Sequence, residues 1–547
     1  MSRPLRAALL CAAVAALVTI PGLGSGTLWD NSETAYGEVA REILLTHDWV
    51  VMHLNGAAWF VQPPLYFWIA AICAKIFGLG AFALRFPSAL ATIVMGAFTA
   101  YALTRDLGSR AGIYAGVVLS TCLMQAIVGR LAIMDALLDL SVLLSIAWWF
   151  RGLQTGRARY FLYGTIAAAL GFLTKGPVAP VGALIAIVPY ALWESRAGEL
   201  RLPRWPVWIG CVAVFAVIAA PWFAALVART GPHAVMELIG HYTVGRYTGT
   251  IENQSGPVWY YLPVIVLGFF PWIAFLPSAI ASAIGTLREP HDLARGQWLR
   301  LSLVWSVVTL LFFSFAKTKL PNYIALELPA LAVLAALYLD GAVAKARSRS
   351  AIVSTAAVPF VVLALAAAIV VFTRDNRLTG AFEQLAFNLV YVGAAIVAGT
   401  LIAFFLFWLG RARSAAPYAI GGAMVLAVAF LALLALPQAE QFKPIPHLAP
   451  IIQAQRKPGD AVAILHVSGG NALVFYTRPH VYVVVGPHDP NPGGQGVSPQ
   501  AVICTAPRTW LIAPAATQTP TFGHGRRKIA RWGKAQLYLY EGAGCST

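Results

Sequence analysis

A run of acidic side chains beside a hydrophobic segment is the first part of this sequence that could do chemistry. Residues 28–64 read LWDNSETAYGEVAREILLTHDWVVMHLNGAAWFVQPP, which is too polar for a bilayer and too aromatic for a linker. A carboxylate can accept a proton from an incoming hydroxyl or amine. The plainer alternative is a solvated loop with a short amphipathic helix. The carboxylates in question are Asp30, Glu33, Glu38, Glu42 and Asp48.

Isolated basic residues farther along the chain could act together with these carboxylates. Lys175 interrupts an apolar run in LTKGP, Arg246 lies in a polar loop, and Lys319 follows Lys317 in FSFAKTKLPNY. Charges near membrane depth cost a few kcal/mol unless they are paired or solvated, so they often mark a cavity. Lysine and arginine can stabilise a phosphate as it leaves. Carboxylates and cations together suit group transfer from a lipid phosphate donor at a membrane surface.

Each of these charged residues also has a purely structural explanation. Lys175 could simply end a helix. Lys319 could be an interfacial lysine with its stem in the membrane. Asp135 and Asp139, four residues apart on one helical face, could form a structural bridge with Arg130. The functional interpretation therefore rests on the whole set of charges.

The composition identifies the class of protein that must position these residues. The chain is 59% hydrophobic and only 11% charged, with 17 tryptophans, which is typical of a polytopic membrane protein. The net charge of +17 does not indicate a nucleic-acid partner, because the basic residues form short clusters between apolar runs. These basic loops follow every second apolar run. By the positive-inside rule they are cytoplasmic, as is the N-terminus.

Hydropathy predicts a polytopic α-helical membrane protein with about 13 transmembrane helices, at about 20 residues per crossing. A short apolar segment over residues 63–78 is expected to be a re-entrant or interfacial helix. The predicted spans cover residues 7–24, 83–103, 111–128, 131–150, 160–174, 177–193, 206–227, 259–280, 299–315, 322–340, 351–372, 386–408 and 417–436.

The tail after the last span changes character and predicts a separate domain. Residues 437–547 are richer in glycine, proline and polar residues, and the apolar runs AVAILHV, HVYVVV, TWLIAP and AQLYLYE have strand length. With a helix near residues 446–455, they predict a small α/β domain. The odd number of spans places it outside the cytoplasm, where Cys504 and Cys545 could form a disulfide. Residues 1–436 would then form the transmembrane domain, with residues 25–82 as its first outer loop.

An ordered set of motifs resembles the bacterial GT-C glycosyltransferases related to the protein O-mannosyltransferases and the lipid A aminoarabinose transferase. The motifs include WDNSETAYGEVAREIL, QPPLYFW, GRLAIMDALLD, GFLTKGPVA, GPVWYYLPV and FSFAKTKLPNYIALELPAL, and the resemblance covers roughly residues 25–340. It implies a GT-C fold with extracytoplasmic interfacial helices. It also implies transfer of a sugar from a polyprenyl-phosphate donor, such as an undecaprenyl-phosphate sugar, outside the bacterial inner membrane. The acceptor would be lipid A, a glycan or a protein.

The resemblance also implies roles for individual residues. The acidic motif of the family falls on Asp30 and Glu33, either of which could be the base. The aminoarabinose branch has adjacent acids here, and Glu33 aligns with the second. The TKG lysine is Lys175, the KLP lysine is Lys319, and the aspartate that begins span four is Asp135.

The chain departs from the family pattern at two places. Where the aminoarabinose branch has Glu-Lys before the Pro-Pro pair, Val61 and Gln62 stand here, which removes an expected phosphate contact. Gln254 stands where a histidine is common upstream of WYY. These departures argue against aminoarabinose as the sugar.

The resulting expectation is a glycosyltransferase in which Asp30 or Glu33 deprotonates the acceptor. Lys175, Lys319 and Arg246 would bind the donor phosphate. The scheme requires no metal, although a divalent cation could replace the missing lysine. A flippase for lipid-linked sugars and a catalytically silent relative are the alternatives. Further residues with a substrate-binding or structural role would be Tyr36, Gln62, Asp135, Gln254, Tyr260 and Tyr261.

Overall fold

The structure is a computed structural model that divides into two compact units. The helical unit comprises residues 1–24, 60–69 and 85–435, and the mixed unit comprises residues 25–59, 70–84 and 436–547. The structure describes residues 1–29, 32–195, 200–250, 254–288, 292–345, 348–374, 380–477, 480–484, 496–515 and 526–541.

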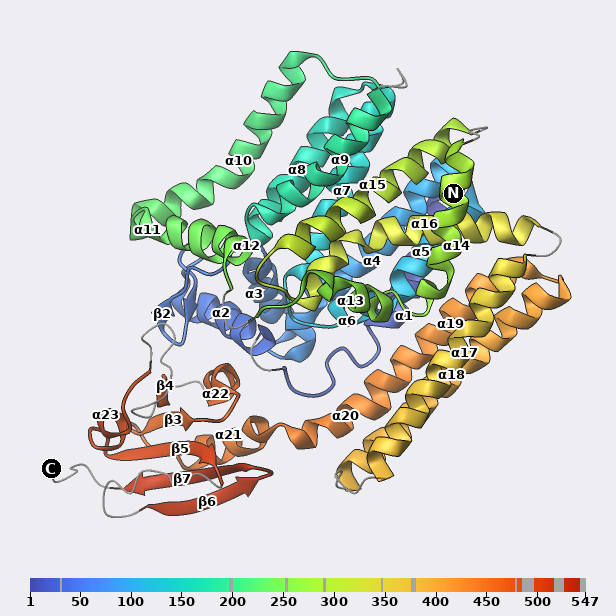
Figure 1. The fold of residues 1–547 in the computed structure, drawn as a ribbon. Helices are drawn as coiled ribbons and strands as arrows, with labels where there is room; N and C mark the ends of the chain where they lie inside the picture. Colours follow the sequence, from blue (N-terminus) through green and yellow to red (C-terminus); the bar gives the residue numbers. More distant parts are fainter. Residues whose placement is uncertain are drawn as a thin grey trace. The chain divides into compact units, whose positions relative to one another are not determined.

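Long apolar helices dominate the helical unit (Figure 1). Within the described residues, nine helices are long and apolar enough to cross a membrane, and the bent pair Val258–Gly268 and Trp272–Arg288 would make a tenth. The protein is therefore a multi-pass membrane protein. The nine are α4 (Ala81–Leu107), α7 (Asp135–Thr155), α9 (Val178–Ser195), α10 (Trp205–Thr230), α15 (Leu293–Phe315), α16 (Leu328–Ala344) with its preceding turn η4 (Pro321–Glu327), α17 (Arg349–Arg374), α18 (Gly380–Leu409) and α19 (Ala416–Phe430) with its extension.

Three other predicted spans are helices that are shorter or more polar. Helix α1 (Arg3–Thr19) has 17 residues and α5 (Ser109–Thr121) has 13, fewer than the ~20 of a straight crossing. Helix α6 (Leu123–Val128) continues from α5, while α8 (Ala158–Lys175) carries a basic residue near each end. The total of about 13 crossings stays a prediction.

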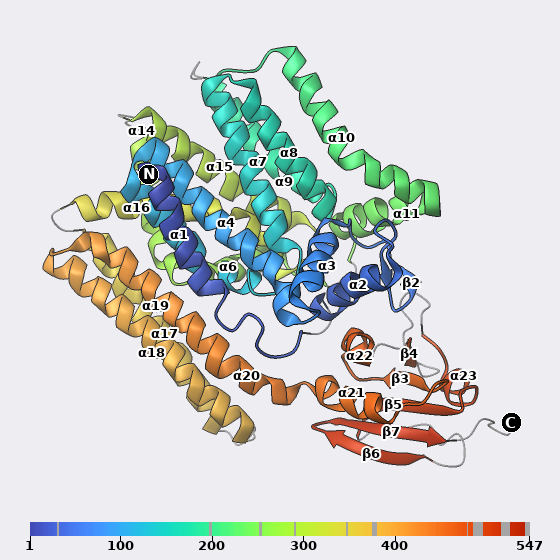
Figure 2. The same ribbon diagram turned by 180° about the vertical axis from the view of Figure 1, so that it is seen from behind.

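Helix α16 forms the centre of the helical unit. Of the apolar 18-residue stretch that it forms with the preceding turn, 89% is buried. It packs against α5, α14 (Leu276–Arg288) and α15, while α7 packs against α8 and α9, and α10 against α8. Helices α17, α18 and α19 pack together (Figure 2). Helix α5 can approach α1 closely because Gly116 has no side chain. A Cβ at this position would lie 2.5 Å from the Cys11 sulfur.

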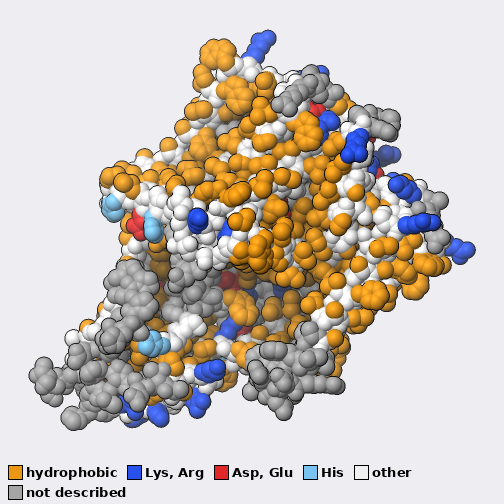
Figure 3. All heavy atoms as spheres, in the orientation of Figure 1, with side chains coloured by type: hydrophobic (Ala, Val, Ile, Leu, Met, Phe, Trp, Pro, Cys, Tyr) orange, Lys and Arg blue, Asp and Glu red, His pale blue; other side chains and the backbone are white. Residues whose placement is uncertain are grey.

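The surface of the helical unit fits a lipid environment. Helix α10 exposes large apolar side chains, with Trp205 72%, Val212 70% and Val217 74% accessible. Figure 3 shows hydrophobic side chains covering the visible face of these helices. Such a face would be unfavourable in water and is expected in a bilayer.

Short elements connect the long helices. The predicted short apolar segment is helix α3 (Leu65–Phe77). The others are α11 (His233–Val235), η1 (Met236–Gly245), α12 (Arg246–Thr248), η2 (Val258–Tyr260), α13 (Tyr261–Gly268), η3 (Trp272–Phe275), η5 (Arg413–Ala415), η6 (Leu431–Ala435), α20 (Leu436–Ala439) and η7 (Glu440–Phe442).

The mixed unit contains a five-stranded sheet of order β4-β3-β5-β7-β6. Strand β3 pairs in parallel with β4 and β5, whereas β7 is antiparallel to β5 and β6. The predicted small α/β domain is thus confirmed. Its elements are α21 (Pro444–Gln455), β3 (Ala461–Leu465), α22 (Gly470–Thr477), β4 (Val481–Val484), α23 (Pro499–Ile503), β5 (Arg508–Pro514), β6 (Arg527–Trp532) and β7 (Ala535–Glu541).

Strand β5 lies at the centre of the sheet because its side chains are apolar on both faces. Trp510 and Ile512 pack on one face, and Leu511 and Ala513 on the other. The sequence did not predict β6, because its basic RKIARW pattern lacks an apolar run. The predicted disulfide involves Cys545, which lies outside the described residues.

The N-terminal part of the mixed unit carries the acidic stretch. Helix α2 (Ser32–Thr46) is followed by a two-stranded hairpin, β1 (His53–Leu54) and β2 (Ala57–Ala58). Helix α2 packs against α22. The acidic loop and the C-terminal sheet therefore belong to one compact unit.

Candidate active site

Lys175 and Asp135 form an ion pair at one end of the helical unit. The Lys175 Nζ lies 2.6 Å from Asp135 Oδ1, and the two side chains are only 13% and 7% exposed. Lys175 is the last residue of α8 and Asp135 the first of α7, and Gly176, with φ of +63°, ends α8. Helix ends thus place both predicted residues together, and at this low exposure each charge needs the other.

Tyr323 joins this ion pair to Arg246. The Lys175 ammonium lies 4.9 Å from the centre of the Tyr323 ring. Arg246 Nη1 donates a hydrogen bond of 3.2 Å to the Tyr323 hydroxyl. Two of the predicted phosphate-binding cations therefore share one tyrosine, which the sequence analysis did not single out. Its only sequence signal is its position four residues after Lys319 in KLPNY.

Lys319 uses its ammonium group to cap helix α15. Its Nζ donates to the carbonyl oxygens of Phe313 at 3.3 Å, Ser314 at 2.6 Å and Ala316 at 2.7 Å. A lysine ammonium has three donors, and cations at helix C-termini are stabilising. Lys319 is also buried, with 5% exposure. Its position is thus fixed by the end of the helix.

Residues 254–261 pack beside Lys319. The Lys319 amide donates to the Gln254 carbonyl at 2.9 Å. The Lys319 ammonium lies 5.7 Å from the ring of Tyr261, which in turn meets Tyr260 edge-on at 5.1 Å. A Cβ on Gly256 would lie 2.8 Å from the Tyr260 ring and 3.1 Å from Lys319, so a larger residue there would displace the tyrosine ring. The predicted Gln254, Tyr260 and Tyr261 thus gather around this lysine.

Several buried polar groups of the helical unit have no hydrogen-bond partner among the described residues, and two of them lie close to these cations. The Tyr261 hydroxyl belongs to a fully buried side chain and makes no hydrogen bond. Asp139 lies one turn after Asp135, is 2% exposed, and neither of its carboxylate oxygens accepts a hydrogen bond. Buried polar groups are usually satisfied, so such exceptions need an explanation.

Arg130 does not form the structural bridge with Asp135 that its sequence position allowed. Its guanidinium donates to the carbonyl oxygens of Val18 and Thr19, both at 2.9 Å, and Pro21 at 2.7 Å. Burial, followed by the charge of neighbouring Arg85, lowers the pKa of Arg130 to about 10. Arg130 therefore caps helix α1, and Asp135 forms its ion pair with Lys175 instead.

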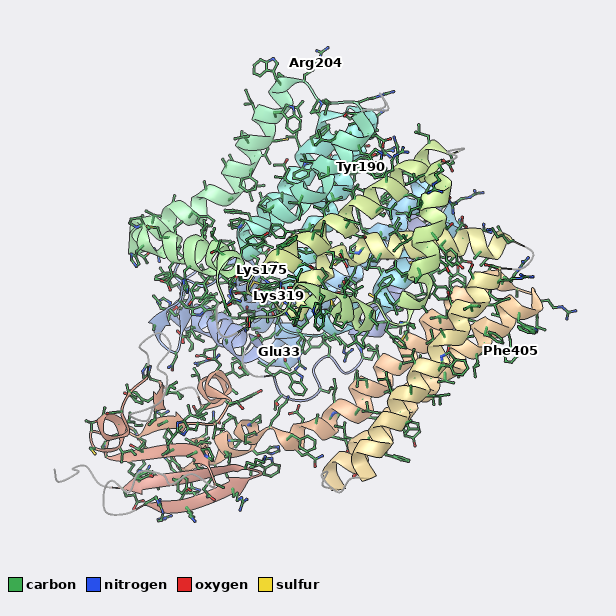
Figure 4. The ribbon with its side chains drawn as sticks, viewed as in Figure 1. Glu33, Lys175, Tyr190, Arg204, Lys319 and Phe405 are labelled. Carbon is green, nitrogen blue, oxygen red and sulfur yellow. The ribbon has the colours of Figure 1, made fainter. Side chains whose placement is uncertain are left out.

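The predicted cations and a predicted cytoplasmic loop lie at different ends of the helical unit. Figure 4 shows Lys175 and Lys319 near one another and Arg204 at the opposite end of the long helices. Arg204 is the N-cap of α10 and follows the basic loop after α9. This separation agrees with the alternation of charge in the sequence.

In the mixed unit, Glu33 occupies the first turn of α2. Its Oε2 accepts a hydrogen bond of 2.8 Å from the Trp29 amide, and its side chain is 2% exposed. A glutamate in this position satisfies an amide at the start of the helix. Asp30, the other predicted base, lies outside the described residues.

The remaining acids of this stretch bind groups inside the mixed unit. Glu38 is fully buried and paired with Arg41; burial raises the pKa of Glu38, against the opposing effect of Arg41. Glu42 accepts the Gly56 amide at 2.9 Å, and Asp48 accepts the Val50 amide at 2.9 Å. Asp30 and Glu33 stay the predicted bases.

The other predicted residues have different surroundings. Tyr36 is half-buried and meets Trp59 edge-on at 6.2 Å. Gln62 is buried, at 9% exposure. Within the described residues, no three His, Cys, Asp or Glu side chains are grouped closely enough to hold a metal ion.

Comparison with known proteins supports the resemblance predicted from the motifs. A family described as dolichyl-phosphate-mannose-protein mannosyltransferase matches residues 61–224. An undecaprenyl phosphate-alpha-4-amino-4-deoxy-L-arabinose arabinosyl transferase of Erwinia tasmaniensis is 32% identical over 378 residues, which cover 67% of this chain and 65% of that protein. A second such transferase, from Proteus mirabilis, is 32% identical over 60% of this chain and 59% of its own. The chain thus spans less than two thirds of the length of these curated relatives.

A solved structure shows the same fold. The crystal structure of ArnT from Cupriavidus metallidurans bound to undecaprenyl phosphate matches with a TM-score of 0.80 and covers 98% of each chain at 23% identity. The apo form of that protein gives a TM-score of 0.78. The predicted GT-C fold is therefore confirmed. The chain is similar to the mannosyltransferase family and the arabinosyl transferases named above.

Proposed function

We propose that this protein is a membrane glycosyltransferase that transfers a sugar from a polyprenyl-phosphate-linked donor to an acceptor at the membrane surface. The observation that carries the proposal is the group formed by Lys175, Tyr323 and Arg246, in which two cations share one tyrosine. A departing lipid phosphate gains negative charge, which two preorganised cations can stabilise. The GT-C fold and the transferases that the chain resembles support this assignment.

Lys175 and Arg246 are the proposed donor phosphate ligands. Asp135 would hold the Lys175 ammonium in place, because their 2.6 Å contact fixes the end of a flexible side chain. Arg246 presents a planar guanidinium, which suits phosphate oxygens. The unpartnered Tyr261 hydroxyl would supply a further donor.

Lys319 would act differently from the other two cations. Its three donors already bind carbonyl oxygens of α15. We therefore assign it an electrostatic contribution to the phosphate site and a structural role, in which it fixes the segment from Gln254 to Tyr261.

The proposed base is Asp30 or Glu33. Either carboxylate would accept a proton from the acceptor hydroxyl or amine as this group attacks the anomeric carbon. The sugar–phosphate bond would break in the same step, and the polyprenyl phosphate would leave with the bonding electron pair. One displacement of this kind inverts the anomeric configuration.

The relatives and the charge pattern support finer assignments. The transferases that the chain resembles are named for undecaprenyl phosphate donors, which supports an undecaprenyl-phosphate sugar here. The alternating basic loops support a location in the bacterial inner membrane, with a cytoplasmic N-terminus and a periplasmic C-terminal domain. The acceptor would be lipid A, a glycan or a protein. Val61, Gln62 and Gln254 argue against aminoarabinose as the sugar.

The experiment that tests the proposal offers purified protein a panel of undecaprenyl-phosphate sugars and acceptors. We expect transfer with at least one pair, and its loss in Lys175→Met. Asp30→Asn and Glu33→Gln identify the base, since the variant that lacks it should lose transfer while still binding donor. Equal product formation in both variants would contradict the base assignment, and no transfer with any donor would contradict the proposed activity.

A catalytically silent relative that binds lipid-linked sugar is the second candidate. It is favoured by Gln62, an uncharged and buried residue where related transferases carry a lysine. This candidate predicts saturable binding of an undecaprenyl-phosphate sugar without turnover by the wild-type protein. Measured turnover would exclude it.

A further inference from the structure

We propose that three residues of the C-terminal segment, Glu440, Lys443 and Tyr476, position the catalytic carboxylates of the acidic loop. These three residues are called the clamp below. The inference rests on the proposed function, because it concerns the loop that carries Asp30 and Glu33. It gives the C-terminal segment a positioning role in the reaction.

Lys443 holds the loop just before the proposed bases. Its ammonium donates to the Thr27 carbonyl at 3.1 Å and to the Thr27 hydroxyl at 3.2 Å. The same ammonium lies 3.8 Å from the centre of the Trp29 ring, a cation–π contact at close range. Lys443 is only 12% exposed, so solvent weakens these contacts little.

Glu440 completes the arrangement around Thr27. Its carboxylate accepts a hydrogen bond from the Thr27 hydroxyl and lies 2.7 Å from Lys443 Nζ. A Cβ on Gly26 would lie 2.7 Å from the Glu440 carboxylate, so the loop backbone runs directly against this side chain. Charged hydrogen bonds of this kind are the strong ones.

Tyr476 binds the residue between Thr27 and Trp29. Its hydroxyl accepts a hydrogen bond of 2.8 Å from the Leu28 amide. Helices α2 and α22 pack closely at Gly37 of α2. A Cβ at this position would lie 3.1 Å from the Phe475 ring of α22. Figure 2 shows α22 beside α2.

The clamp acts on the carboxylates through Trp29. The Trp29 amide donates to Glu33 Oε2 at 2.8 Å, and the Trp29 carbonyl accepts the Thr34 amide at 3.3 Å. Asp30 is the next residue in the chain. A shift of Trp29 would therefore move both candidate bases, and misplacement by about 1 Å can cost about 100-fold in rate.

The positioning role and a merely structural role predict different kinetics. The donor phosphate ligands Lys175 and Arg246 belong to the helical unit, so loss of the clamp should leave the donor KM unchanged and lower kcat. A general loss of folding would instead lower the amount of active protein and its melting temperature. The conservative Lys443→Arg variant keeps the charge, the donors and the stacking on Trp29, so it should restore kcat.

The test measures hydrogen exchange of the loop in the intact, substrate-free protein in lipid nanodiscs. In Lys443→Met and Tyr476→Phe, we expect exchange of the peptide covering residues 26–29 to rise by about tenfold, with Lys443→Arg close to wild type. The matched control is Lys528→Met, because Lys528 is an exposed lysine of the edge strand β6. This control should change neither exchange nor turnover.

The same variants are then assayed with the undecaprenyl-phosphate sugar that is active in the panel above. Faster exchange together with reduced kcat and unchanged donor KM supports the inference. Unchanged exchange in Lys443→Met overturns it, as does faster exchange with unchanged kcat. If the wild-type protein transfers no sugar, the proposed function fails, and the exchange data alone show whether the clamp holds the loop.

Discussion

Lys175 and Asp135, 40 residues apart in the sequence, meet at 2.6 Å across the ends of two neighbouring helices. The pair carries no net charge by itself, so the proposed phosphate site needs a further cation. We propose Arg246 for this role, because both cations contact Tyr323. Three elements therefore build this group: the end of α8 carries Lys175, the start of α12 carries Arg246, which adds the excess positive charge, and the turn η4 carries Tyr323.

Replacing Lys175 should affect stability and activity separately. Lys175→Met leaves Asp135 buried without its partner, so we expect unfolding to become easier by about 3 kcal/mol. Sugar transfer should fall by about 100-fold or more, because a proposed phosphate ligand is lost. Thermal unfolding in detergent and initial rates with the active donor measure the two effects.

The double variant Lys175→Met with Asp135→Leu serves as the control. It removes the unpaired carboxylate, so most of the stability should return while transfer stays low. Recovery of transfer in the double variant would show that Lys175 only neutralises Asp135.

Tyr323→Phe should weaken donor binding without unfolding the protein. The change removes the hydroxyl that accepts the hydrogen bond from Arg246 and keeps the ring beneath Lys175. We expect the donor KM to rise about tenfold, the effect of one lost hydrogen bond to a charged group. The matched control is Tyr338→Phe, whose hydroxyl binds Ser350 instead. A donor KM equal to that of the control would contradict the proposed role of Arg246.

Part of this site could be predicted from the sequence because two of its charged side chains lie at helix ends. Lys175 precedes a Gly-Pro pair that must end a helix, and Asp135 precedes an apolar run that must begin one. Charges at such ends lie near the edge of a membrane span. The predicted set thus included Lys175, Asp135, Arg246 and Lys319, which the structure brings to one end of the helical unit.

Other contacts could not be read from the sequence because they depend on tertiary packing. Tyr323 is one of 19 tyrosines, and nothing local marks it as the residue between two cations. Lys443 contacts Thr27 across 416 residues. Arg130 binds backbone carbonyls at the end of α1, and residue type alone does not show which backbone groups lack partners.

Lys319→Met should destabilise the end of helix α15. The variant removes the donors from three carbonyl groups at this helix end. We expect a loss of about 1–3 kcal/mol in the free energy of unfolding, measured as a lower melting temperature in nanodiscs. Lys317→Met is the matched control, because Lys317 lies two residues away and is exposed. Equal melting temperatures in the two variants would show that the cap contributes nothing.

The C-terminal sheet should lose stability at low pH through Asp460. Burial alone would raise the pKa of this carboxyl, but hydrogen bonds from Arg508, the Lys457 amide and Trp510 outweigh it and lower the pKa below its ordinary value. A carboxyl with a depressed folded-state pKa stabilises the fold above its unfolded pKa of about 3.9. This contribution is lost as the pH falls through the folded-state pKa.

We therefore expect Asp460→Asn to lower the free energy that protects β5 from hydrogen exchange by about 1–3 kcal/mol at pH 7. The difference from wild type should shrink as the pH falls below about 3.9. Hydrogen exchange of residues 508–514 in the intact protein, corrected for the intrinsic rate at each pH, measures this difference. Glu541→Gln is the control, because its carboxylate is 46% exposed and lies 3.9 Å from Arg527. Exposed pairs contribute little, so this variant should follow the wild-type pH profile. Equal protection of Asp460→Asn and wild type at pH 7 would refute the role of Asp460, because its charge would then add nothing to the sheet.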